Sequence, residues 1–318
     1  MSLPQVILNI RTFDVVLLVM VSYITFRFKS SSNDVPYFKY VWKRIKRLVV
    51  PAYIMLTVFF LLSELSSLLI QHTHAFGLST IISSFLFLDS GIPYIWIVRI
   101  FVVIAFFAPV ISSLTENLSL PRNKIRLIGV SVISFIIIMV GGAIYDRFTN
   151  EDSLLNIFLR SWILMPIIYV AITQIISILL LFDNKGKVLS VLMFLFFIVI
   201  MIIKGDIIAF NPDDFKTPPQ LYWVVYGLIL SVILFMIIPN KRQGFLEFVS
   251  INSLNIYLVH IVVLLFYNKF LGTIELRAIH LHYYLSMWVV RYALVLGLSL
   301  LMVYTWPSIK TKILRIKR

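Results

Sequence analysis

The chain has 318 residues, of which 60% are hydrophobic and only 13% are charged, and its mean hydropathy is +0.98. This composition excludes a soluble domain, because a soluble domain of this length needs a charged surface. The net charge of +14 is better explained by basic loops on one side of a membrane than by nucleic-acid binding, since no soluble basic domain is present. The chain contains no cysteine, which excludes disulfides and cysteine-based zinc sites or nucleophiles.

Long apolar runs predict an all-α fold, a polytopic membrane helix bundle with about nine transmembrane helices. A membrane helix needs about 20 mostly apolar residues, and these runs lack the period-two alternation of membrane strands. The predicted spans are 8–28, 48–70, 92–114, 125–144, 155–182, 187–204, 221–239, 247–270 and 285–306. The stretch 76–89 is too short to span and fits an interfacial or re-entrant helix. We predict a single transmembrane domain over residues 1–318.

The loops between these spans alternate in charge. The segment 27–47 and the C-terminal tail are rich in Lys and Arg, whereas the loop 71–91 contains neither. The positive-inside rule therefore places the C-terminus in the cytoplasm and the N-terminus outside. An outside N-terminus without a leading signal suggests that one further span precedes this chain.

Four ionisable side chains lie inside predicted spans, where each costs about 2.5–3.5 kcal/mol on insertion scales. They are Arg99, Arg160, Arg291 and His260. The predicted orientation puts all four in the outer half of the membrane or near its midplane, and a common cavity would explain why several cations are tolerated there. Arg160 and Arg291 are also close enough to helix ends to snorkel to the interface instead.

One of these side chains belongs to a polar stripe. Ser253, Tyr257 and His260 occur at i, i+4 and i+7 and share one face of a helix. A lone histidine is more often a packing residue, but this stripe on an otherwise apolar helix indicates a polar site. His72 and His74 have no further metal ligands nearby, so we predict no metal site.

A pair of arginines stands directly before the second predicted span. Arg44 and Arg47 are one helical turn apart, and two guanidinium groups at this spacing can clamp a phosphate with bidentate hydrogen bonds. The alternative is anchoring to anionic lipid headgroups, worth about 1 kcal/mol per basic residue. Spacing alone favours the lipid anchor.

Four stretches together resemble membrane-bound acyltransferase family 3, the bacterial O-acyltransferases that modify surface polysaccharides. They are FDVVLLVMVSYITF followed by KRIKRLVVP, with Arg44, Arg47 and Pro51; YIWIVRIFVVIAFFAPVI, with Trp96, Arg99 and Pro109; KTPPQLYWVVYGL; and NSLNIYLVH, with Asn252, Ser253, Leu254, Ile256, Tyr257, Leu258 and His260. Each stretch is weak alone, whereas their order and spacing are fairly specific.

The resemblance implies transfer of an acyl group, usually acetyl, to a hydroxyl of a surface polysaccharide or of its lipid-linked precursor. The donor would be acetyl-CoA or another acyl-CoA from the cytoplasm, with Arg44 and Arg47 contacting the CoA phosphates. The implied location is the bacterial inner membrane, crossed many times. The implied partners are the lipid bilayer, the acyl-CoA and the saccharide acceptor.

The chain departs from the family pattern near its beginning. The family's first span carries an Arg, and ten residues beyond it a His that is regarded as catalytic, but no such His precedes Arg11. The glycine usual after the serine of the second span is also absent, because Tyr23 follows Ser22 directly. Two explanations stay open: an upstream segment missing from this chain, or an inactive family member that aids export or binding. The remaining motifs favour the first.

As a hypothesis, a general base deprotonates the sugar hydroxyl, which then attacks the thioester carbonyl, while a basic group such as Arg99 stabilises the developing charge. His260, with Tyr257 and Ser253 on the same helix face, is the motif-matched base within the chain. We expect it to support the first-span His of the family. The rival function is a polysaccharide exporter or flippase, which does not require an arginine clamp for CoA.

Overall fold

The computed structural model describes residues 12–30, 36–71, 75–118, 123–148, 153–203, 215–237, 244, 248–249, 252–270 and 292–305. Within these residues the long regular elements are all helices and none is a strand, which confirms the predicted all-α fold. The helices form two compact units, one from Met1–Arg47 and Ile82–Pro239, the other from Leu48–Ile81 and Asn240–Arg318.

The predicted spans correspond to helices of the structure. Five helices are long and apolar enough to cross a membrane: Tyr37–Leu65, Trp96–Leu118, Ile125–Arg147, Leu155–Leu179 and Asn184–Ile202. Three shorter apolar helices, Leu221–Ile237, Ser253–Leu265 and Tyr292–Thr305, overlap three further predicted spans. The multi-pass membrane fold is therefore confirmed, while the count of nine and the sidedness of the termini stay predictions.

The first unit contains most of the helices. It comprises α2 (Asp14–Ser30), the beginning of α3 (Tyr37–Gln71), the end of α4 (Leu78–Phe85), α5 (Trp96–Leu118), α6 (Lys124–Phe148), α7 (Leu154–Leu159), the π-helix η2 (Arg160–Leu164), α8 (Met165–Leu179), α9 (Asn184–Ile203) and α10 (Leu221–Ile237). Elements α7, η2 and α8 follow one another without a break and form the span Leu155–Leu179.

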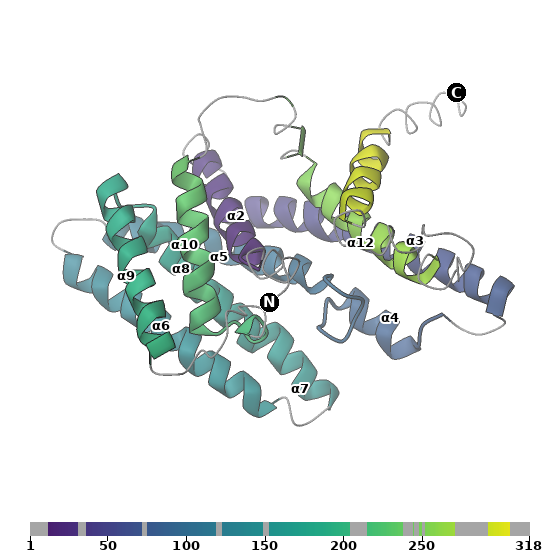
Figure 1. Cartoon of the computed structure of the whole chain (residues 1–318), viewed down its shortest axis with the longest axis horizontal. Coiled ribbons are helices and arrows are strands. Elements are labelled where there is room, and N and C mark those ends of the chain that lie inside the picture. The colour runs from purple at the N-terminus through teal and green to yellow at the C-terminus, as the bar shows by residue number, and fades with distance from the viewer. Residues whose placement is uncertain are drawn as a thin grey trace. The chain divides into compact units, whose positions relative to one another are not determined.

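Two of these helices form the centre of the unit. In the spans Leu155–Leu179 and Trp96–Leu118, 67% and 61% of the apolar window is buried, against 17% in Ile125–Arg147 and 6% in Asn184–Ile202. Helix α8 packs on α5, α6 and α2, and α9 packs on α10 at the edge of the unit (Figure 1). Polar groups on α5 and α8 are therefore shielded by protein, whereas most of the apolar windows of α6 and α9 are not buried by the described residues.

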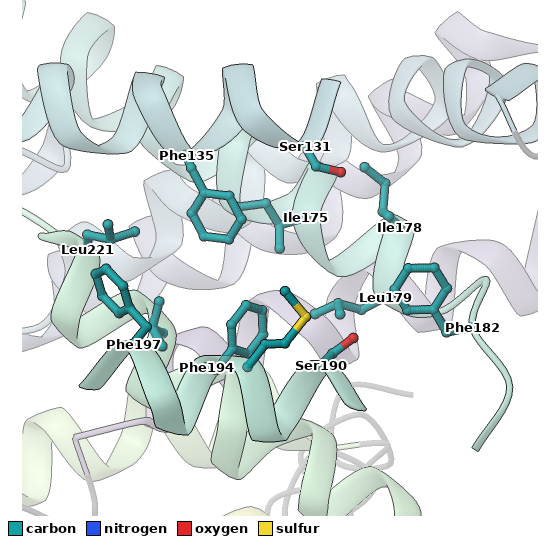
Figure 2. A pocket seen from close by; sticks show the side chains of 12 residues that line it. Ser131, Phe135, Ile175, Ile178, Leu179, Phe182, Ser190, Phe194, Phe197 and Leu221 are labelled. Atoms are coloured by element: carbon teal, nitrogen blue, oxygen red, sulfur yellow. The ribbon is translucent and has the colours of Figure 1, made fainter. Parts of the chain in front are cut away.

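A groove of about 430 Å³ opens between α6, α8, α9 and α10 (Figure 2). Aromatic rings from α6 and α9, those of Phe135 and Phe194, stand in it with their centroids 6.3 Å apart. The polar side chains among its lining residues are Ser131 and Ser190, and none of the lining residues is ionisable. The groove offers apolar contact and no group for acid–base chemistry.

The second unit contains the rest of α3 together with α12 (Ser253–Phe270) and the helix Tyr292–Thr305. The Ala75 N–H donates to the Glu64 carboxylate on α3 at 3.0 Å. The ring of Phe76 then packs on Phe59 and Phe60, with centroid distances of 5.6 and 5.4 Å. These contacts fix the segment that leads into α4.

We predict that Gly227→Ala destabilises the first unit. A Cβ at Gly227 on α10 would lie 2.6 Å from Cγ2 of Val16 on α2, and overpacking of this kind costs about 1–3 kcal/mol. The measurement is thermal unfolding of the purified protein in detergent. The matched control is Gly129→Ala on α6, where a Cβ would meet nothing within 4 Å; there the better helix propensity of alanine should raise stability by up to about 1 kcal/mol. Equal effects of the two changes would contradict this account of helix packing.

Candidate active site

Helix α4 and the loop after it form the first part of the site. The short helix predicted within 76–89 is confirmed, because α4 has eight residues and cannot span. It ends in a Schellman motif, in which the N–H of Leu88 donates to the Ser83 carbonyl at 2.8 Å and that of Phe87 to the Ser84 carbonyl at 3.1 Å. Phe87 has a φ of 53°, a left-handed conformation that costs about 1–2 kcal/mol for a residue with a Cβ.

Side-chain contacts hold this loop in place. The Ser84 hydroxyl accepts the Ile92 N–H at 2.9 Å, and the Trp162 indole donates to the Leu86 carbonyl at 3.0 Å. A Cβ at Gly91 would lie 2.8 Å from the backbone of Ser84, so only glycine lets the loop approach α4 this closely. The strained backbone at Phe87 is thus held by several neighbours, a situation typical of functional sites.

Arg99 is the centre of the cluster. Arg99 is fully buried, with 0% of its surface exposed. One terminal nitrogen donates to the Phe87 carbonyl at 2.7 Å, and the other donates to Asp89 at 3.0 Å in an ion pair. The second carboxylate oxygen of Asp89 accepts the Ser161 hydroxyl at 2.9 Å. Asp89, 27% of whose side chain is exposed, therefore joins the α4 loop, α5 and the π-helix.

The π-helix η2 follows from the sequence just beyond it. Pro166 has no N–H to donate and its ring would clash with the carbonyl four residues earlier in a regular helix. In the widened segment the Met165 N–H instead reaches the Arg160 carbonyl. Single π-turns inside α-helices are frequent at functional sites. Here the turn contains both Arg160 and Ser161.

A second arginine joins the same region. The guanidinium carbon of Arg160 lies 5.5 Å from the centroid of the Tyr145 ring on α6, a cation–π geometry. The Tyr145 hydroxyl is also within electrostatic range of Asp89 and Arg99. Arg160 is half-buried over a buried ring, which favours this packing over simple snorkelling, while the predicted common cavity with Arg99 stays a prediction.

Two donors in this cluster have no hydrogen-bond partner among the described residues. They are Nε of Arg99 and the hydroxyl of Tyr169. Tyr169, on α8, is 1% exposed, and its hydroxyl lies within electrostatic range of both Arg99 and Asp89. Buried polar groups are nearly always paired, so each exception calls for an explanation.

The arginine pair on α3 forms a separate polar region. A terminal nitrogen of Arg44 donates to the buried Ser22 hydroxyl on α2 at 3.2 Å, whereas the Arg47 side chain is exposed. The two guanidiniums are close enough to repel each other, and neither forms an ion pair with an acid in the described part of the chain. Two uncompensated cations one turn apart favour an anion between them.

A hydroxyl network lies beside this pair. Tyr23, the residue after Ser22, is fully buried and its hydroxyl bonds to Ser177 on α8. Ser177 donates to Thr115 on α5 at 2.9 Å, and the Gln174 amide donates to the same oxygen at 3.1 Å. Tyr23 stands where the family resemblance predicts glycine. Its side chain therefore occupies the space between α2, α5 and α8 that a glycine would leave open.

In the second unit, α12 carries the predicted Ser/Tyr/His stripe. His260 is half-buried, its ring lies 5.1 Å from that of Tyr257, and its Nδ1 bonds to the Tyr257 carbonyl. A carbonyl can only accept, so Nδ1 carries the proton and a neutral imidazole keeps its lone pair on Nε2. Ser253, at the first residue of α12, is exposed. This tautomer suits a proton acceptor.

Several predictions remain untested. Arg99 and His260 belong to different units, so their common cavity stays a prediction. Arg291, His72 and His74 lie outside the described residues. In the described ranges no group of three or more His, Asp or Glu side chains is placed to hold a metal ion.

Asp89 and Tyr169 are the residues that the sequence analysis missed. The signal for Asp89 was its position as the one acid at the end of the apolar stretch 76–89. Tyr169 carried no such signal, because a tyrosine in an apolar helix is ordinary.

A family model described as an acyltransferase domain, that of acyltransferase family 3, matches residues 1–306. The match covers both units and each of the four stretches quoted from the sequence. No curated protein and no solved structure matches the chain.

Proposed function

Because the chain belongs to acyltransferase family 3 and is a membrane acyltransferase, we propose that it transfers an acyl group, usually acetyl, from acyl-CoA to a saccharide hydroxyl. The acceptor is a surface polysaccharide or its lipid-linked precursor in the bacterial inner membrane. The observation that carries the choice of donor is the pair of Arg44 and Arg47, which forms no ion pair with an acid among the described residues.

The arginine pair suits the phosphates of CoA. Arg44 is oriented by Ser22, so part of the entropy cost of fixing a long side chain is already met before a ligand arrives. Exposed Arg47 supplies a second planar guanidinium one turn away. A lipid anchor needs only positive charge, whereas an arginine held by a hydrogen bond offers a fixed direction for bidentate contact.

The chemistry needs a base and a group that stabilises negative charge. In the proposed step a base takes the proton of the acceptor hydroxyl, whose oxygen bonds to the thioester carbon. The carbon–sulfur bond then breaks, and the CoA thiolate accepts the proton. The family motifs assign the proton transfer to His260, as the motif-matched base of this chain, and the stabilisation of the oxyanion to Arg99.

We expect Arg47→Ala to weaken acetyl-CoA binding by about 10- to 100-fold, because a hydrogen bond to a charged group contributes about 1.5–3 kcal/mol. Binding is measured by calorimetry on the purified chain in nanodiscs. The control is Lys43→Ala, which removes the same charge from an exposed position on the same helix and should change affinity less than about fivefold.

Two results would count against this function. Equal weakening by Arg47→Ala and Lys43→Ala would indicate general electrostatic attraction to a membrane surface. Absence of acetyl-CoA binding by the wild-type chain would favour the exporter, which needs no such donor.

A further inference from the structure

Arg99 Nε and the Tyr169 hydroxyl are hydrogen-bond donors without an acceptor in the described residues. Both residues are at most 1% exposed, so lipid and bulk water cannot satisfy them. The unpaired state is costly, and a stable structure keeps such groups where something else supplies the acceptor. The two residues lie on α5 and α8, which pack on each other.

The rest of the Arg99 guanidinium is already engaged. Its two terminal nitrogens bind the Phe87 carbonyl and Asp89, and these contacts fix the plane of the group and hence the direction of Nε–H. The second carboxylate oxygen of Asp89 accepts a hydrogen bond from the Ser161 hydroxyl. The free donor is therefore oriented by the surrounding fold before any ligand binds, which is the condition for electrostatic preorganisation.

Tyr169 lies near the middle of the membrane span. It is eight residues from Ser161, which bonds to Asp89, and eight from Ser177 of the hydroxyl network. Within the span Leu155–Leu179 it therefore lies between these two polar contacts.

We propose that the Tyr169 hydroxyl and Arg99 Nε–H form the oxyanion hole of the acyl transfer, with Tyr169 as a catalytic residue. This inference rests on the proposed function. When the acceptor oxygen bonds to the thioester carbon, the carbonyl electron pair moves to oxygen, and that oxygen accepts both hydrogen bonds. The electron pair on that oxygen then re-forms the carbonyl as the carbon–sulfur bond breaks. The CoA thiolate leaves and accepts the proton.

The test is Tyr169→Phe in the full chain, purified in nanodiscs, with transfer of labelled acetyl from acetyl-CoA to a saccharide acceptor or, without one, to water. Removing one oxyanion donor is expected to lower kcat about 100- to 1000-fold, with the Kd for acetyl-CoA unchanged. Thermal stability should stay the same or rise, because the change deletes a buried hydroxyl without a partner. If Tyr169 had only a structural role, the variant would not lose kcat while keeping its thermal stability.

The matched control is Tyr226→Phe, which removes the hydroxyl of a buried tyrosine on α10 and should leave kcat within about twofold. A wild-type kcat in Tyr169→Phe, or a loss of acetyl-CoA binding equal to the loss of kcat, would overturn the oxyanion hole and leave the proposed function standing. A wild-type chain that transfers acetyl to neither saccharide nor water would overturn both.

Discussion

Asp89→Ala is expected to lower the free energy of unfolding by about 3 kcal/mol, because it leaves a buried guanidinium without its compensating charge. The charge left behind is that of Arg99, whose side chain is 1% exposed. The same change removes the acceptor of the Ser161 hydroxyl, so that the Trp162–Leu86 hydrogen bond remains to join the π-helix to the α4 loop. Acyl transfer should be lost together with stability.

The measurement is thermal unfolding in detergent, compared with the double variant Asp89→Ala/Arg99→Met. Replacing both partners of a buried pair is often close to neutral, so the double variant should regain most of the stability and none of the activity. The control is Asp183→Ala, which removes an exposed acid that caps the Gly186 N–H at 2.8 Å and should cost about 1 kcal/mol. A double variant no more stable than Asp89→Ala would contradict the ion-pair explanation.

The sequence predicts the helices well because lipid imposes a simple requirement. A span must satisfy its own backbone and present apolar side chains over a fixed length, and both properties are local. The same reasoning finds Arg99, since a cation in an apolar run costs energy wherever its partner lies. The short helix before Asp89 was also predictable, because length alone shows that 76–89 cannot span.

The partners of these residues were not predictable from one sequence. Asp89 meets Ser161 across 72 positions, and no periodicity links a loop acid to a serine in another span. The π-helix depends on Pro166, yet a proline inside a membrane helix more often indicates a kink. The left-handed backbone at Phe87 is likewise hidden, because that conformation usually selects glycine. The Asp89–Ser161 contact and the backbone at Phe87 depend on tertiary contacts that override local preference.

Arg44 and Arg47 were predictable in part from the sequence. Their spacing predicts a shared helix face, and the structure confirms the single turn between them on α3. The difference between them depends on Ser22, whose hydroxyl orients Arg44 and leaves Arg47 exposed. Spacing alone favoured a lipid anchor, whereas this asymmetry supports a directed phosphate contact.

His260→Ala is expected to lower kcat about 100- to 10,000-fold, the usual contribution of a positioned general base. The structural reason is the bond between Nδ1 and the Tyr257 carbonyl, which leaves the lone pair of the neutral imidazole on Nε2. Acetyl-CoA binding should be unchanged, because the proposed donor contacts are on α3. The measurement is acetyl transfer by the purified chain, with Kd determined in parallel.

The control is Asn255→Ala, which alters an exposed residue on the same helix and should keep kcat. If His260→Ala retained more than about a tenth of the wild-type kcat, the base would have to be another group of the chain.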